Sequence, residues 1–131
     1  EISYVQSLSV LRSMQGIKSN GTTDLLALGN PATLSSSGLP QAERQVTAIK
    51  RIFGEQNSRV FTGEDATEER LKAEAERAKI IHIAAHAYLN DTSPIYSYIE
   101  FANRDSSNDG LLEAWEIMKL KINAELIVLS A

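Results

Sequence analysis

The 131-residue chain contains no cysteine. Disulfide bonds, thiolate zinc sites and a thiol nucleophile are therefore excluded from this stretch of sequence. Histidine is nearly as scarce, since only His82 and His86 are present. Any acid–base chemistry that needs an imidazole near neutral pH must use one of these two side chains.

Long apolar runs are also missing. No run approaches the roughly 20 residues that a transmembrane helix needs. Glu1 is not followed by the basic region and apolar core of a signal peptide. We therefore expect a cytoplasmic protein without a membrane partner. The formal net charge of -4 argues against nucleic acid as the main partner.

Alternating strands and helices are predicted along a chain that has the length of one domain. A helix is expected from Pro40, because apolar residues recur at three- and four-residue steps up to Phe53 and Gly54 suits its end. Thr67 suits the N-cap of another helix. This order predicts an α/β fold with a mostly parallel sheet. The expected strands are 2–5, 24–28, 58–62, 79–85, 98–102 (an outer strand or hairpin arm) and 125–130, and the remaining expected helices are 7–14 and 112–120.

The last predicted strand, 125–130, is apolar and is expected to be buried. Ala131 follows it directly, and a native terminus rarely follows a core strand with no residue to spare. The first residue, Glu1, is not an initiator methionine. We therefore expect the chain to be part of a longer polypeptide.

The four-residue spacing of His82 and His86 means different things on a helix and on a strand. On a helix the two side chains share a face and can chelate a metal ion. Ile80, Ile81 and Ile83 favour a strand, on which the two histidines lie roughly 13 Å apart. No cysteine or carboxylate stands at a helpful spacing, so we expect no metal site and no cofactor.

The two histidines are expected to differ in their roles. His82 falls in mid-strand, where a hydrogen-bonded core histidine is expected. His86 falls at the carboxyl end of the strand, where active sites of open α/β sheets gather, and is a candidate general base. The alternative is a loop histidine with no role. If strand 125–130 lies beside this one, about 4.8 Å away, a thiol directly after Ala131 would be within reach of the imidazole.

Other candidate residues have simpler interpretations. Ser130 lacks the G-x-S-x-G turn of a serine nucleophile. The acidic run 64–76 is expected to be a solvated helix face, and Trp115 is expected to pack in the core or against a partner. Asp91 and Asp105 lie in loops on either side of the His86 region, where they could orient a base or bind a cationic group. Solvated loop aspartates are nevertheless commoner.

Six segments in order resemble the CHAT domain, a caspase-like cysteine peptidase family, and together they cover essentially the whole chain. RLKAEAERAKIIHIAAHAYL resembles the segment that carries the family's catalytic histidine, and DGLLEAWEIMKLKINAELIVLSA resembles the helix and strand that lead to its catalytic cysteine. The other four segments are ISYVQSLSVL, LLALGNP, LPQAERQVTAI and TGEDATEERLK.

The resemblance implies a three-layer caspase-haemoglobinase-like fold and a cysteine endopeptidase with a His–Cys dyad. Residues 1–131 would then be a partial CHAT domain that ends before the catalytic cysteine, expected directly after Ala131. The matching base is His86, and the backbone N–H of Ala87 would help to form the oxyanion hole. Family members usually have glycine in place of Ala87, and alanine accepts a positive φ poorly.

The resemblance also implies partners, and two other functions remain open. A peptide or protein substrate is expected, with TPR repeats in the same parent chain and a regulatory protein as further partners. One alternative is a catalytically inactive interaction module on the same fold. The other is a flavodoxin-like or receiver-type domain. A domain of this type needs an acidic cluster or a phosphate loop after the carboxyl ends of its strands. Asp24 instead precedes its strand, which argues against this alternative.

Overall fold

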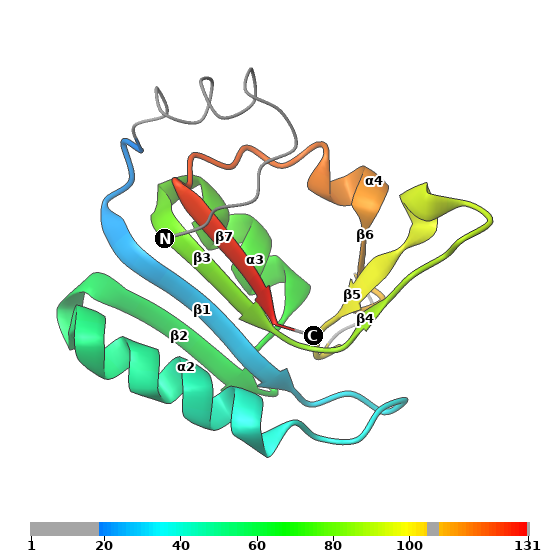
Figure 1. Ribbon diagram of the computed structural model, residues 1–131, viewed down its shortest axis with the longest axis horizontal. Coiled ribbons are helices and arrows are strands. Elements are labelled where there is room, and N and C mark those ends of the chain that lie inside the picture. The colour runs from blue at the N-terminus through cyan, green and yellow to red at the C-terminus, as the bar shows by residue number, and fades with distance from the viewer. Residues whose placement is uncertain (1–18, 105–107, 131) are drawn as a thin grey trace, which may run out of the picture.

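The computed structural model describes residues 19–104 and 108–130. Its main sheet has four parallel strands in the order β2-β1-β3-β7 (Figure 1). The predicted α/β class with a mostly parallel sheet is confirmed. The strand and helix predicted at 2–5 and 7–14 lie outside the described residues. The bounds are β1 Thr23–Pro31, β2 Ser58–Gly63, β3 Ala78–Ala84 and β7 Leu126–Ser130.

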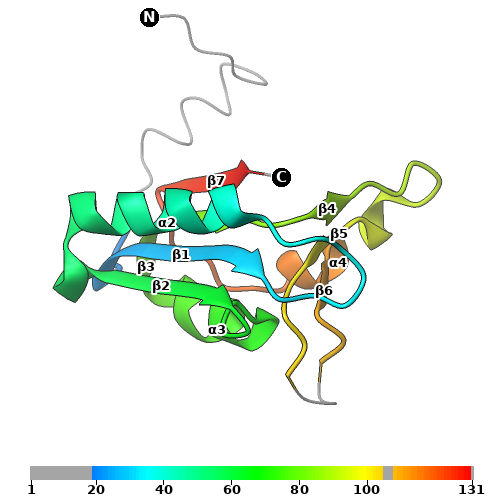
Figure 2. The ribbon, with the colours of Figure 1, turned by 90° about the horizontal axis from the view of Figure 1, so that it is seen from below.

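Helices cover both faces of this sheet, which gives three layers (Figure 2). On one side, α2 (Pro40–Phe53) begins with proline and ends at Gly54, as predicted. Its buried Val46 packs with Leu25 and Ala27 of β1. The apolar stripe thus docks the helix over β1 and β2, because burying such a stripe is what stabilises an amphipathic helix.

The other face of the sheet carries the larger core. There α3 (Glu68–Glu74) is capped by Thr67, whose Oγ1 accepts a hydrogen bond from Arg70 N at 3.3 Å, as the sequence predicted. Leu71 of α3 packs into one buried cluster with Ile81 and Ile83 of β3. Two 3-10 helices, η1 Glu55–Asn57 and η2 Ala75–Arg77, lead from α2 into β2 and from α3 into β3.

A small antiparallel sheet stands beside the main one (Figure 1). Its strands are β4 Ala87–Tyr88, β5 Tyr98–Glu100 and β6 Leu111–Glu113. The 3-10 helix η3 (Pro94–Tyr96) lies between β4 and β5, and the one-turn helix α4 (Ala114–Ile117) follows β6. None of the helices in the described ranges is long and apolar enough to cross a membrane.

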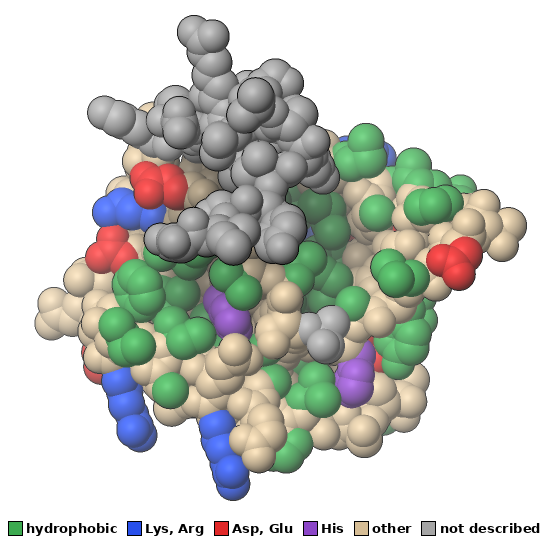
Figure 3. Space-filling model, in the orientation of Figure 1, with side chains coloured by type: hydrophobic (Ala, Val, Ile, Leu, Met, Phe, Trp, Pro, Cys, Tyr) green, Lys and Arg blue, Asp and Glu red, His purple; other side chains and the backbone are tan. Residues whose placement is uncertain are grey.

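Two predictions about the C-terminal third are wrong. The helix predicted at 112–120 is β6 plus a single turn, because Leu112 pairs with Ile99 in the small sheet and is buried there. Tertiary packing overrides local helix preference in this segment. The strand predicted to be buried, β7, is largely exposed, with Leu129 at 62% of its full surface. Among the described strands, β7 pairs with β3 alone, so it is an edge strand of the main sheet. Figure 3, in the same orientation as Figure 1, shows hydrophobic side chains at the surface of the face toward the viewer.

Packing between α2 and β1 depends on the absence of a side chain at Gly29. A Cβ there would lie 2.8 Å from Val46 Cγ2 and 3.1 Å from Ala42 O. Gly29→Ala is expected to push α2 away from the sheet and to lower the free energy of unfolding by about 1–2 kcal/mol. Urea denaturation measures this change. Gly38→Ala is the control, since its Cβ would meet Asn30 Oδ1 at an ordinary 3.5 Å. Equal stability of both variants would contradict this account of the packing.

Candidate active site

His86 lies two residues past the end of β3, at the rim where the carboxyl ends of the parallel strands meet. It is half-buried, and its carbonyl oxygen accepts a hydrogen bond from Glu100 N at 2.9 Å. Its backbone is therefore held between the main sheet and the small sheet. The predicted position of His86 at a strand end is confirmed.

The imidazole of His86 is oriented by the loop between β1 and α2. Its Nε2 lies 2.9 Å from the carbonyl oxygen of Ser37. A carbonyl oxygen only accepts hydrogen bonds, so this contact is a hydrogen bond when Nε2 carries the proton. In the neutral ring Nδ1 is then the nitrogen that can accept a proton.

The loop that presents Ser37 is itself tied to the small sheet. Ser35 Oγ and Ser36 Oγ donate hydrogen bonds to the buried carboxylate of Glu100, the second at 2.8 Å. The loop, Glu100 and His86 therefore form a closed ring of contacts. The two hydroxyl groups are neutral donors, and they supply hydrogen bonds that the buried Glu100 carboxylate no longer receives from water.

Ala87 directs its backbone N–H away from the small sheet. Because Glu100 N donates to His86 O, those two residues form a hydrogen-bonded antiparallel pair. Ala87, which pairs with Ile99, is next along the strand and takes the non-hydrogen-bonded position. Asn30 is the one described residue other than glycine with positive φ, so Ala87 occupies a backbone conformation that alanine accepts.

The end of β7 lies beside the end of β3. Ala84 pairs with Ser130 in parallel register. A hollow of about 380 Å³ opens next to Ser130, against the first turns of α2, with Leu39, Gln41 and Gln45 in its wall. The rim thus combines an oriented imidazole with an outward N–H, and neither His86 nor Ala87 lines the hollow beside Ser130.

The model of the CHAT domain family matches residues 1–131, the whole chain. The chain belongs to the CHAT family. The resemblance found in the sequence is thereby confirmed, and it places the protein with the caspase-like peptidases. No match to this CHAT chain is found among curated proteins or among solved structures.

The other histidine of this CHAT domain lies in the core. His82 is 5% exposed and pairs with Ala27 on one side and Val128 on the other. The prediction of a core histidine is confirmed. The prediction that it is hydrogen-bonded is wrong for Nε2, which has no partner within the described part of the chain.

The remaining candidates are scattered. Asp91 is exposed in the loop after β4, and Asp105 lies outside the described residues. Trp115 is half-buried; its Nε1 donates to Glu113, and Lys119 Nζ lies 4.3 Å from its ring. The acidic run 64–76 is not solvated throughout, because Glu68 is 1% exposed.

Sequence analysis missed the two contacts that hold His86. Ser37 contributes its carbonyl oxygen, which every residue has, so no residue type marks it. The serine run 35–37 gave a faint signal, since clustered hydroxyls can satisfy a buried carboxylate. Pairing that run with Glu100 requires the tertiary fold.

Burial of His82 makes stability depend on pH. Desolvation lowers the pKa of His82 below its usual value near 6.5, so the folded protein binds its proton less readily than the unfolded chain. As pH falls below about 6.5, the unfolding free energy should decrease by up to ~1.4 kcal/mol per pH unit from this group. Urea denaturation between pH 7.5 and 5 measures the slope. His82→Leu should flatten it, and an unchanged slope would contradict the assignment.

Proposed function

We propose that the protein is a cysteine endopeptidase of the CHAT family, in which His86 is the catalytic general base and acid. The observation that carries the proposal is the pairing of Ala84 with Ser130. If the register continued past this pair, the second residue after Ser130 would face His86, because neighbouring strands lie about 4.8 Å apart. In the family this position, directly after Ala131, holds the nucleophilic cysteine.

The proposed reaction is acyl transfer to a thiol. His86 takes the thiol proton, and the thiolate sulfur forms a bond to the carbonyl carbon of a peptide. The carbonyl oxygen becomes an oxyanion, which accepts a hydrogen bond from the N–H of Ala87. When the C–N bond breaks, His86 returns the proton to the leaving amine. Water, deprotonated by His86, then hydrolyses the thioester and releases the thiol.

The contact of His86 with Ser37 supports this role. The 2.9 Å distance from Nε2 to the carbonyl oxygen fixes the ring plane and favours a proton on Nε2. Nδ1 is then the atom that exchanges protons with the thiol. The same carbonyl oxygen stabilises the imidazolium that forms after proton transfer, because it faces the protonated nitrogen in both states.

Removal of the imidazole tests the base. His86→Ala in the full polypeptide should lower kcat/KM for peptide cleavage by about 10²–10⁴-fold, because general base catalysis contributes that much. The assay uses a peptide library with and without candidate activators. Thermal unfolding should change little, since His86 is only half-buried. Equal cleavage by both proteins would reject His86 as the base.

A proline substitution tests the oxyanion donor. Ala87→Pro removes the N–H that points away from β5, and kcat should fall by about 10²–10³-fold with little change in KM. Ala87→Gly keeps the N–H and is the matched control, with activity near that of the wild type. If the proline variant retains wild-type kcat, Ala87 is not the oxyanion donor.

The identity of the residue after Ala131 separates this proposal from its alternative. Cysteine there, together with labelling by a thiol-reactive peptide probe, supports the peptidase. Another residue would favour a catalytically inactive caspase-like interaction module. For the active form we propose a protein substrate in the cytoplasm, with TPR repeats in the parent chain and a regulatory protein that controls cleavage.

A further inference from the structure

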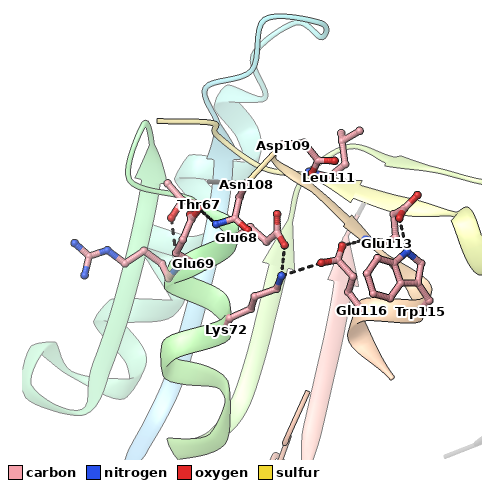
Figure 4. Close-up of polar contacts among 11 residues, drawn as sticks. Thr67, Glu68, Glu69, Lys72, Asn108, Asp109, Leu111, Glu113, Trp115 and Glu116 are labelled. Atoms are coloured by element: carbon pink, nitrogen blue, oxygen red, sulfur yellow. Dashed lines mark hydrogen bonds and ion pairs between the residues drawn. The ribbon is translucent and has the colours of Figure 1, made fainter. Parts of the chain in front are cut away.

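A second hollow, of about 550 Å³, lies between the start of α3 and the turn from β6 into α4 (Figure 4). Four carboxylates line it: Glu68, Asp109, Glu113 and Glu116. Trp115 forms part of the wall. An acidic wall alone does not define a binding site, so the inference depends on how each carboxylate is satisfied.

Glu68 is the unusual member of this group. Its side chain is 2% exposed, and its Oε1 pairs with Lys72 of the next helical turn. Its Oε2 has no hydrogen-bond partner within the described ranges. Figure 4 shows the carboxylate between α3 and the loop that carries Asp109, with one oxygen turned away from Lys72. Leaving a buried charged acceptor without a donor is costly, so this oxygen is suited to receive one from a ligand.

The charges of the hollow do not balance. Lys72 also pairs with Glu116 at 2.9 Å, so one ammonium group serves two carboxylates. Glu113 accepts hydrogen bonds from Trp115 Nε1 and from the backbone N–H of Glu116, which are neutral donors. The lining has four carboxyl groups, and among the described residues Lys72 is the one ammonium group that pairs with any of them. Burial raises the pKa of Glu68, as expected for a carboxylate short of donors.

A cationic side chain fits this hollow better than a metal ion does. In the described residues, no three His, Cys, Asp or Glu side chains are arranged to hold a metal. A guanidinium group instead offers five N–H donors in a planar fork that matches carboxylates, and it tolerates the ammonium group of Lys72 more readily than a compact divalent ion would. Exposed Asp109 at the mouth would meet it first.

We propose that this hollow binds an arginine side chain presented by a protein partner, with Glu68 Oε2 and Asp109 as its acceptors. Because Oε2 is buried, binding of the guanidinium requires side chains around Glu68 to move. The proposal concerns binding alone and stands whether or not the protein cleaves peptides.

The segment from β5 to Ala102 connects His86 with the start of α3, beside the hollow. Glu100 contacts the backbone of His86, and two residues further on Ala102 N donates to Ala66 O at 2.9 Å, beside the start of α3. Two residues of strand span about 7 Å. Asp109 also lines a neighbouring hollow that contains Glu100.

Binding can be measured with a short peptide and its neutral isostere. The probe is acetyl-Gly-Gly-Arg-Gly-Gly-amide, and the control peptide carries citrulline in place of arginine. Calorimetry gives the Kd, and the indole N–H signal of Trp115 in NMR spectra, assigned with Trp115→Phe, shows where the peptide binds. We expect the arginine peptide to bind with a Kd of about 1 mM or lower and to shift the indole signal, and the citrulline peptide to bind at least about tenfold more weakly.

Two substitutions locate the acceptors. Glu68→Gln keeps the shape and removes the charge, and should weaken binding about tenfold or more. Asp109→Asn retains the side-chain oxygen that accepts a hydrogen bond from Leu111 N. It measures the contribution of the Asp109 charge to binding, and it does so even if the Glu68→Gln variant unfolds. Glu76→Gln, an equal charge change at an exposed position outside the hollow, should leave the Kd unchanged.

Three results would overturn the proposal. One is equal binding of the citrulline peptide. Another is wild-type affinity in folded Glu68→Gln and Asp109→Asn. The third is an indole N–H signal of Trp115 that does not shift when the arginine peptide is added. A shift of this signal by calcium ion, with no displacement of the ion by the peptide, would overturn the proposal in the same way.

Discussion

The parallel pairing of β3 with β1 on one side and β7 on the other is the constraint on which the rest of the structure depends. Leu28 pairs with Ile83, and Ile83 with Leu129, so three carboxyl ends reach the same rim. A slip of one residue would turn every side chain of a strand to the opposite face. Burial of Ile81 and Ile83 on the α3 side excludes such a slip, so core packing fixes the position of His86.

Contacts beyond the sheet then fix the orientation of the imidazole. The backbone of His86 belongs to the ladder with β5, whereas its ring contacts the loop after β1 at Ser37. Glu100 joins these two parts, because its N–H bonds to His86 and its carboxylate holds Ser35 and Ser36. Each element is short and weak alone. Closed into a ring, they restrict the same side chain from two directions, because the backbone of His86 and its ring are held by separate contacts.

The sequence predicted most accurately the elements whose signals are local. The stripe that ends at Phe53, the cap at Thr67 and the isoleucines around His82 each depend on residues a few positions apart. The incorrect predictions concern segments whose structure is determined by contacts with residues distant in the sequence. Leu112 joins a strand because Ile99 is available to pair with it, and Glu68 is buried beside Glu113 and Glu116, which are distant from it in the sequence. The exposure of β7 has the same origin, since a strand pattern predicts burial only where another layer covers it.

Glu68 and Glu100 show how similar burial can produce different chemistry. Both carboxylates are at most 4% exposed, and both lie beside the turn that contains Asp109. Glu100 accepts from two serine hydroxyls of one loop, so its bonds fix that loop and it has little need of a further donor. Within the described part of the chain, Glu68 pairs with the ammonium group of Lys72, which Glu116 shares, and its Oε2 has no donor. A satisfied carboxylate positions its neighbours, whereas a partly satisfied one gains free energy when a ligand supplies the missing hydrogen bond. The two carboxylates therefore differ in role: Glu100 holds the loop that orients His86, and Glu68 is suited to bind a cation.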